Sequence, residues 1–478
     1  MGRGELGGLK AQSFVGRPKN RPNTCIRTTC PIPILIIIDD HHKRFLCGTL
    51  ENCYNIQLGG PMFRLLVSMF CVLILSQLSP GQVDAQFRGP DRNGVFPETG
   101  LLKSWPENGP ELLWSREDLD RGFASVSVTD EAIYVAGLEG RDEYLTVLDH
   151  KGNTLWRLRY GGGCQRTHRD TRCTPTVEDS RIYLISGRGE VVCVNKDERK
   201  IEWSVPAFQK FQGEFWQWEI AESPLIVDDK VIYTPGGSQT SMVALDKYTG
   251  ETVWQTESLK TPSAFVSPIL IEMGGNKIIV GILTEHIIGV DAESGKFLWT
   301  VRYHDIETPT FHEWAPKNNC VTPLYHDGHL FVSSGYDHVG IMFELKNDGS
   351  EIEQKWINKD LDNHHGQVVR IGSYIYGSNW LDNPVGNWCC VDWDTGKTMY
   401  EKKWICKGSI TAADGMLYCY EERRGNLALV TPTPDDFAIV SSFRITKGSG
   451  PHWTQPVIHD GILYIRHGGA LMAYKISA

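Results

Sequence analysis

Residues 290–299, VDAESGKFLW, have near-copies elsewhere in the chain. The copies are VLDHKGNTLW at 147–156, VNKDERKIEW at 194–203, ALDKYTGETVW at 244–254 and VDWDTGKTMY at 391–400. A unit that recurs at a regular interval is typical of a repeat architecture, in which each copy buries its apolar face against its neighbours. The sequence therefore predicts one large repeat domain.

A second landmark gives the number of units. Each unit contains a short apolar segment with one large apolar or aromatic residue near its end. These residues are Tyr134, Tyr183, Tyr233, Ile279, Phe331, Tyr376, Tyr418 and Tyr464, so the period is 42–52 residues. Eight units of about four strands each predict an all-β fold, an eight-bladed β-propeller of four-stranded antiparallel blades.

The repeated turn and the repeated tryptophan have structural roles in this interpretation. Gly250 and Gly295 follow the turn aspartates, and glycine adopts the positive φ that a tight hairpin requires. Asp246 and Asp291 are expected to accept hydrogen bonds from the turn's own amides rather than to act as catalytic acids. The tryptophan that ends each unit, such as Trp254, is expected to pack between neighbouring blades.

The two ends of the domain predict how the ring closes. The eighth unit stops at Ala478 after its third strand, ALMAYKISA. The missing fourth strand is found at 110–117, PELLWSRE, where Trp114 has the context of the repeated tryptophan. We therefore expect the N-terminal strand to complete the last blade, which leaves no open sheet edge.

The first 109 residues differ from the repeats. Residues 62–85 have the charged start, apolar stretch and small-residue end of a secretory signal peptide. Residues 1–61 are interpreted as an over-called start of the reading frame or as a disordered extension. Residues 86–109 form a leader whose GPDRNG segment indicates turns, and 110–478 form the propeller. The chain is thus expected to be exported, periplasmic or extracellular, without a stable membrane span.

The repeat resembles the quinoprotein-type family of PQQ-like repeats. The resemblance covers roughly residues 86–478 as imperfect copies of SPxxxDGxxY and ALDxxTGxxxW. The family includes quinone-dependent alcohol dehydrogenases and BamB-like proteins that bind other proteins without a cofactor. The resemblance thus implies the fold but leaves the function open.

The loops between strands predict where a site lies. Turns alternate between two faces in an antiparallel meander, and the long irregular loops all fall on one face. Histidine and tryptophan are frequent there beside polar groups, which is typical of a ligand site. The candidate ligand-binding residues are His168, Arg169, Trp216, Trp218, Glu219, Glu222, His312, Glu313, Trp314, Tyr336, Asp337, His338, His364, His365, Asn379, Trp380, Asp382, His452 and Trp453.

Three functional hypotheses follow. The first is a binding or scaffold protein without a cofactor, which takes a protein, peptide or carbohydrate on the loop-rich face. The second is a pyrroloquinoline quinone-dependent alcohol dehydrogenase with calcium. Cys389–Cys390 matches the cysteine pair that the resemblance implies for such enzymes, although NWCCVDW favours a strand. The third is a metal site formed by His312, His364, His365 and His452.

Net charge and cysteine content bear on the class of partner and on a possible disulfide. The formal net charge of −10 argues against nucleic acid as a partner, since phosphate binding needs a basic surface. In an exported protein Cys164 and Cys173, which flank one loop, are the pair best placed to form a disulfide.

Overall fold

The computed structural model describes residues 35–39, 44–49, 52–57, 83–166, 168–306 and 317–478. The chain divides into two units, Met1–Pro80 and Gly81–Ala478. In the first unit β1 (Leu35–Asp39), β2 (Arg44–Thr49) and β3 (Asn52–Gln57) form a three-stranded antiparallel meander. Residues 62–82 of the predicted signal peptide lie outside the described residues, as do His312, Glu313 and Trp314.

The second unit is an eight-bladed β-propeller, as the repeats predict. Each blade has four antiparallel strands, here lettered A to D from the channel outwards. Blades 1 to 4 contain β7 (Ser127–Val128), β8 (Ile133–Glu139), β9 (Asp142–Leu148) and β10 (Thr154–Gly162); β11 (Thr176–Glu178), β12 (Arg181–Ile185), β13 (Val191–Asn195) and β14 (Lys200–Val205); β15 (Leu225–Val227), β16 (Lys230–Tyr233), β17 (Val243–Asp246) and β18 (Thr252–Gln255); and β19 (Ile269–Met273), β20 (Asn276–Ile282), β21 (His286–Asp291) and β22 (Phe297–Arg302).

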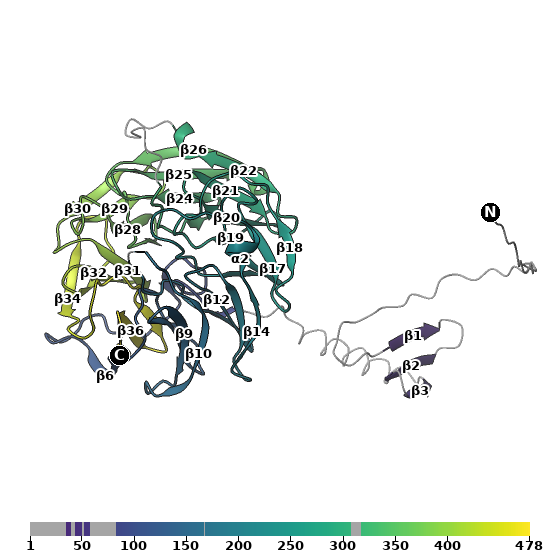
Figure 1. The fold of residues 1–478 in the computed structure, drawn as a ribbon. Coiled ribbons are helices and arrows are strands. Elements are labelled where there is room, and N and C mark those ends of the chain that lie inside the picture. Colours follow the sequence, from purple (N-terminus) through teal and green to yellow (C-terminus); the bar gives the residue numbers. More distant parts are fainter. Residues whose placement is uncertain (1–34, 40–43, 50–51, 58–82, 167, 307–316) are drawn as a thin grey trace, which may run out of the picture. The chain divides into compact units, whose positions relative to one another are not determined.

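The remaining blades follow the same order around the ring. Blades 5 to 8 contain β23 (Leu324–His326), β24 (His329–Ser333), β25 (Gly340–Lys346) and β26 (Glu351–Asn358); β27 (Val368–Ile371), β28 (Tyr374–Ser378), β29 (Trp388–Asp392) and β30 (Thr398–Lys402); β31 (Gly408–Ala413), β32 (Met416–Glu421), β33 (Asn426–Thr431) and β34 (Ala438–Arg444); and β35 (Val457–His459), β36 (Ile462–His467), β37 (Ala470–Lys475) and β6 (Glu111–Arg116). The helical turns among the described residues are α2 (Ala207–Lys210), η1 (Tyr303–Asp305) and η2 (Asn347–Gly349). Figure 1 shows the D strands, among them β10, β18, β26 and β34, along the rim.

The ring closes as the sequence predicts. Strand β6 pairs antiparallel with β37, and Trp114 lies opposite Ala473. In Figure 1 the blue β6 accordingly lies beside the C-terminal end of the chain. The first and last blades are therefore tied by backbone hydrogen bonds, and strand D of the last blade comes from the start of the domain.

The repeated tryptophan locks five of the blades, namely 2, 3, 4, 5 and 8, to the blade that follows. The Trp254 indole Nε1 in β18 donates to the Ala292 carbonyl in the C–D turn of the following blade, at 3.0 Å. Gly295 of that turn has a φ of +71°, and a Cβ there would lie 2.6 Å from the same indole. The turn needs glycine for both its backbone conformation and this close approach. The same indole-to-carbonyl bond joins Trp114 to His150, Trp203 to Lys247, Trp299 to Gly349 and Trp356 to Trp393.

The turn aspartates are structural, as predicted. The Asp246 carboxylate accepts hydrogen bonds from the amides of Tyr248 and Thr249, and Asp291 accepts one from Ser294. These bonds replace the water that would otherwise solvate the turn amides. The repeated sequence therefore encodes a capped turn together with the ring that packs upon it.

Trp254→Phe is expected to destabilise the propeller by about 2–4 kcal/mol, because the Ala292 carbonyl loses its donor and the smaller ring leaves part of the buried contact between the blades unfilled. Val253→Thr is the matched control, since Val253 is exposed on the same strand and such substitutions usually change stability by less than about 0.5 kcal/mol. Urea unfolding followed by circular dichroism measures both variants. Equal stability of Trp254→Phe and the wild type would contradict the locking role.

The leader crosses the central channel, which the sequence did not predict. Strand β4 (Val83–Ala85) pairs antiparallel with β11 of blade 2, and β5 (Val95–Phe96) pairs parallel with β31 of blade 7. Both partners are innermost strands. Residues 86–94 must therefore pass through the channel between the two blades.

Two buried arginines hold this crossing segment in place. Arg92 is 3% exposed and donates to the carbonyls of Ser223, Pro224 and Pro268, at 2.9–3.0 Å. Arg88 is 4% exposed and donates to the Val368 carbonyl at 2.5 Å. Both arginines have positive φ, a backbone conformation that residues other than glycine adopt rarely. The segment is thus a plug that connects blades 3, 4 and 6 through their innermost backbone.

The interpretation of GPDRNG as turns alone is therefore too narrow. The turns serve to place two guanidinium groups among backbone carbonyls. The predicted cleavage point after Ala85 falls at the end of β4, so cleavage there would remove this strand and leave both arginines in the chain. After the plug, the Leu102 amide donates to the Ile476 carbonyl and Trp105 packs on Tyr418 and Phe443, which carries the chain towards β6.

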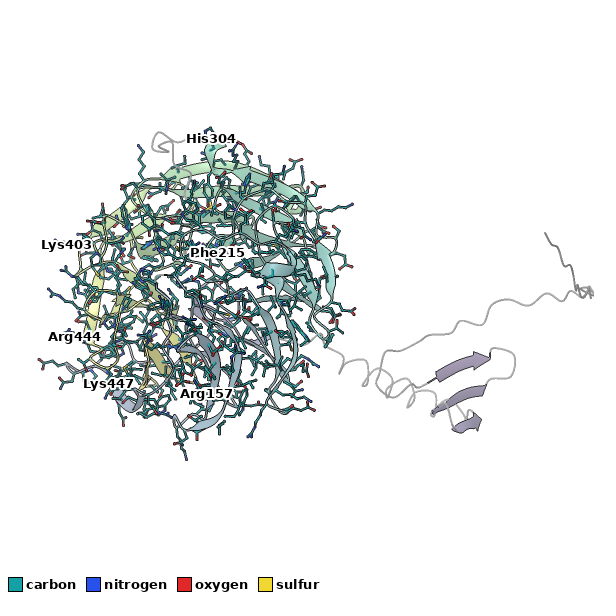
Figure 2. The ribbon with its side chains drawn as sticks, viewed as in Figure 1. Arg157, Phe215, His304, Lys403, Arg444 and Lys447 are labelled. Atoms are coloured by element: carbon teal, nitrogen blue, oxygen red, sulfur yellow. The ribbon has the colours of Figure 1, made fainter. Side chains whose placement is uncertain are left out.

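The outer rim carries charged side chains beside exposed apolar residues such as Leu113, Leu155 and Val253. Figure 2 shows the side chains of Arg157, Lys403, Arg444 and Lys447 at the periphery, whereas Phe215 lies nearer the middle of the ring. In the described residues no helix is long and apolar enough to cross a membrane.

Candidate functional site: an aromatic cavity at the mouth of the channel

A cavity of about 610 Å³ opens in the channel above the plug. Its walls come from the loops that lead into strand A and from loops between strands B and C, the two classes predicted to share one face. Phe87 of the leader also lines it. A concave, largely aromatic cavity of this size is typical of a small-ligand site.

A simple register rule explains which residues line the cavity. The segment that enters strand A is extended, so alternate side chains point to the same side. In five blades a proline ends this segment: Pro175, Pro224, Pro268, Pro323 and Pro456. The third residue before this point defines what we call the mouth ring, and the residue directly before it defines the polar belt.

The mouth ring is mixed in chemistry, whereas the polar belt is uniform. The mouth ring consists of Phe123, Arg172, Ala221, Phe265, Cys320, His365, Lys407 and Trp453, and all but Lys407 line the cavity. The polar belt consists of Ser125, Thr174, Ser223, Ser267, Thr322, Gln367, Ser409 and Gln455, and all but Ser223 and Ser409 line it. Every belt residue carries an uncharged hydroxyl or amide.

The belt also joins neighbouring blades. The Thr174 amide donates to Ser223 Oγ and the Ser223 amide to Ser267 Oγ, each at 2.9 Å. The Gln455 amide donates to Ser125 Oγ at 3.1 Å, which repeats the pattern across the closure of the ring. The side chains at the cavity wall are consequently held in place by the backbone of the preceding blade, as a preorganised site requires.

Aromatic rings form the upper wall. The Trp453 ring lies 4.9 Å from Phe123, 5.0 Å from His168 and 5.2 Å from His365, measured between ring centroids. Trp218 lies 5.5 Å from Phe265. It also stacks on Tyr336, with centroids 6.5 Å apart and planes inclined by 26°. Two indoles from blades 8 and 3 thus present ring surface to the cavity.

One charged cluster lies in the wall. Glu422 pairs with Lys407, and both side chains are almost completely buried, at 4% and 3% exposed. His365 Nε2 lies 2.8 Å from the second carboxylate oxygen of Glu422. Burial by itself raises the pKa of Glu422, but His365 and Lys407 outweigh this effect and lower the pKa to about 2. Glu422 is therefore a carboxylate at neutral pH, compensated by its neighbours.

The neighbouring histidine is neutral. His364 Nε2 lies 2.9 Å from the Tyr336 hydroxyl. Burial, followed by the charges of His365 and Lys407, lowers the pKa of His364 well below its usual value. His364 thus offers hydrogen bonds to a ligand without offering a charge.

The structure brings six of the predicted site residues to the cavity. They are His168, Trp218, Tyr336, His364, His365 and Trp453. They come from four D–A loops and one B–C loop, which converge on one cavity.

Four other predicted residues hold loops in place instead. Glu219 accepts hydrogen bonds from the Gln165 and Arg166 amides, and Glu222 accepts one from the Thr234 amide. Asn379 donates to Glu401. His452 is hydrogen-bonded to the Tyr420 hydroxyl and stacked on His467. These four side chains are 3–7% exposed and lie outside the cavity lining.

The remaining predicted site residues that the structure describes lie elsewhere on the loop face. Trp216 packs under Lys317, whose Nζ lies 4.7 Å from the ring centroid. Trp380 packs on Tyr336 at 5.0 Å. Arg169, Asp337, His338 and Asp382 also lie outside the cavity lining, while His312, Glu313 and Trp314 lie outside the described residues.

Several lining residues were absent from the prediction. Phe87, Phe123, Arg172, Phe265, Glu422 and Gln455 all line the cavity. The spacing to the strand-A proline was the signal that could have found Arg172, Phe265 and Gln455. It also separates Trp453, which lines the cavity, from the adjacent His452, which does not.

The cysteine and metal hypotheses gain no support in the described residues. Cys164 and Cys173 are both unbridged, so the expected disulfide is wrong; Cys173 instead packs in the core, where the Ile185 amide donates to its sulfur at 3.3 Å. Cys389 and Cys390 lie in β29, as NWCCVDW favoured, and outside the cavity lining. No group of three or more His, Cys, Asp or Glu side chains among the described residues is arranged to hold a metal ion.

Comparison with known proteins places the chain in a family. The family model PQQ_2, described as outer membrane protein assembly factor BamB, matches residues 141–402. No curated protein sequence matches significantly. BamB from Moraxella catarrhalis is similar in structure, with 16% identity and a TM-score of 0.55 over 77% of this chain and 100% of that chain.

Other similar structures have lower identity. The computationally designed Ika8 protein has 12% identity and a TM-score of 0.51, covering 77% of this chain and all of its own. The quinohemoprotein alcohol dehydrogenase from Comamonas testosteroni has 12% identity and a TM-score of 0.46, over 84% of this chain and 82% of that chain. Likeness at these identities shows the fold alone. Since the family model spans more than half of the chain, this protein belongs to the PQQ-repeat β-propeller family that the model describes by BamB.

Proposed function

We propose that this protein is an exported binding protein that captures its ligand in the aromatic cavity of its loop-rich face. The observation that carries the proposal is the convergence of Trp453, Trp218, Tyr336 and the His364–His365 pair on one cavity. Rigid aromatic anchors beside a few fixed polar groups give both affinity and orientation. The plug closes the channel below, so a ligand enters from the loop face.

The dehydrogenase hypothesis is less well supported by the residues present. A calcium ion takes six to eight oxygen ligands, whereas Glu422 is the one carboxylate among the described lining residues and is already paired with Lys407 and His365. Cys389 and Cys390 lie outside the lining. The described residues therefore do not fit pyrroloquinoline quinone with calcium.

Trp453→Ala is expected to abolish ligand capture and to leave the melting temperature nearly unchanged, because the ring is partly exposed and faces the cavity. Tryptophan fluorescence titrations against a panel of oligosaccharides and of peptides with alternating apolar and polar residues measure capture. Pyrroloquinoline quinone with Ca²⁺ is included as a separate arm.

Trp216→Ala is the matched control, since Trp216 lies on the same face outside the cavity lining, and it should bind like the wild type. The binding proposal fails if no member of the panel binds, or if Trp453→Ala binds as the wild type does. A saturable response to the quinone alone would instead favour the dehydrogenase. A large loss of stability in Trp453→Ala would show that the ring belongs to the core.

A further inference from the structure

The cavity wall contains polar atoms that lack a partner in the described structure. They are Thr174 Oγ1, Thr322 Oγ1 and Gln455 Oε1 of the polar belt, and Nδ1 of His364 and of His365 beside it. A buried polar group without a hydrogen bond costs about 1–3 kcal/mol, and native structures contain few of them. Five such atoms in residues that line one cavity are hydrogen-bonding capacity that a ligand with polar groups can satisfy.

The ligand these atoms favour is uncharged and hydroxylated. Hydroxyl and amide groups both donate and accept, and so does a neutral imidazole. The Gln455 amide nitrogen already donates to Ser409 Oγ at 3.1 Å, which leaves its oxygen as an acceptor for a ligand donor. A ligand with several hydroxyl groups meets this mixture of donors and acceptors, whereas a purely apolar ligand leaves it unsatisfied.

Charge in the wall excludes a strongly cationic ligand. Arg172 and Arg423 line the cavity, and the single described lining carboxylate, Glu422, is compensated by Lys407. Arg172 is oriented by the carbonyls of Trp218 and His168. The wall thus suits a neutral ligand, or a ligand whose carboxylate lies beside Arg172.

The rings supply the complementary surface. The Trp453 ring is bordered by Phe123, His168 and His365 at centroid distances of 4.9–5.2 Å. The face of an indole carries negative potential, and it attracts the weakly positive C–H groups that line one face of a sugar ring. A saturated six-membered ring with C–H groups on one face and hydroxyls around its edge therefore matches the aromatic rings above and the polar belt below.

We infer that the cavity binds a pyranose unit of an oligosaccharide, with one ring face on Trp453 and the hydroxyl groups on Gln455, Thr322 and His364. This inference rests on the proposed binding function and names its ligand class. Neutral and uronic-acid sugars share the ring and the hydroxyls, and they differ in whether Arg172 has a carboxylate to bind.

The test uses the purified full-length protein and isothermal titration calorimetry with cellotetraose, maltotetraose, chitotetraose and trigalacturonate. At least one of these is expected to bind saturably. Gln455→Leu should weaken that binding about tenfold or more, because the sugar hydroxyl loses its acceptor in a buried site. Gln165→Leu is the matched control, since Gln165 is exposed on the same face outside the lining, and its affinity should equal that of the wild type.

The arms of the test separate the outcomes. Preference for trigalacturonate, lost in Arg172→Met, identifies an acidic sugar, and preference for a neutral tetrasaccharide identifies an uncharged one. If the alternating peptides bind and none of the four saccharides does, the saccharide inference is overturned while the binding function stands. Equal affinities of Gln455→Leu and Gln165→Leu for a bound saccharide would also overturn it, because the polar belt would then not be the binding surface.

Discussion

Arg92→Ala is expected to lower the free energy of unfolding by about 4 kcal/mol, because it strips three buried carbonyls of their donor and leaves a cavity in the channel. The carbonyls belong to Ser223, Pro224 and Pro268, at the entries to strand A of blades 3 and 4. Burial lowers the pKa of Arg92 to about 10, so the guanidinium is charged at neutral pH and each bond is charge-assisted. Urea unfolding at pH 7 measures the loss.

Two further variants show that the loss comes from the fork of hydrogen bonds. Arg92→Lys keeps the charge but places a single point donor among three carbonyls, so its stability should lie between those of the wild type and Arg92→Ala. Arg141→Ala removes an exposed arginine from a hairpin turn and should change stability by less than about 0.5 kcal/mol. A loss below about 1 kcal/mol for Arg92→Ala would mean that residues 86–94 do not plug the channel.

The scaffold of the propeller could be predicted from the sequence, because the sequence patterns that specify it are local and repeated. The Asp246 and Gly250 turn, the Tyr233 strand and the Trp254 slot each lie within one unit, and eight copies give the same answer. Closure by Trp114 was also predictable, since a missing fourth strand and an extra one balance only in a ring. The interblade indole-to-carbonyl bonds follow from the same repeated pair of residues.

The plug could not be predicted from the sequence, because its hydrogen-bond partners lie far away along the chain. Arg88 and Arg92 bind carbonyls that lie 131–280 residues away, and backbone carbonyls leave no trace in a sequence. The leader appears once, so no repeat reports its role. Its glycines and proline indicate turns correctly but give no indication that the turns are inside the channel.

The face that carries the candidate site could be predicted from the sequence, but the individual residues that line the cavity could not. The irregular loops converge on one face, as expected, yet adjacent residues differ in direction. Trp453 lines the cavity while His452 packs against Tyr420 and His467, and Trp218 lines it while Trp216 does not. Counting back from the strand-A proline gives the correct phase for Trp453, but Trp218 lies in a longer loop whose path depends on its contacts with Tyr336 and Phe265.

The buried pair of Lys407 and Glu422 gives the second large expected effect. Lys407→Met is expected to destabilise the protein by about 3–5 kcal/mol, because it leaves the buried carboxylate with His365 as its remaining partner. Glu422→Leu should cost a similar amount, because it leaves the buried ammonium group without its carboxylate. The double variant should be within about 2 kcal/mol of the wild type, since two apolar side chains replace two charges whose desolvation was costly. Lys447→Met is the control: its ion pair with Glu117, at 2.7 Å, is solvent-exposed, and its loss should leave the urea midpoint nearly unchanged.

Acid should reveal the same pair without mutation. The folded-state pKa of Glu422, about 2, lies below the unfolded value of about 4.3. The folded protein therefore binds fewer protons than the unfolded chain between these values, and the stability that Glu422 contributes is complete above about pH 4.5 and is lost as the pH falls towards 2. That contribution is on the order of 3 kcal/mol, and the double variant lacks it, so its stability should fall less steeply than that of the wild type between pH 4.5 and 2. Parallel acid profiles for the two proteins would show that the pKa of Glu422 is not lowered in the folded protein. Single-variant losses that simply add in the double variant would show that Lys407 and Glu422 are not coupled, and His365 would then be the group that holds the Glu422 carboxylate.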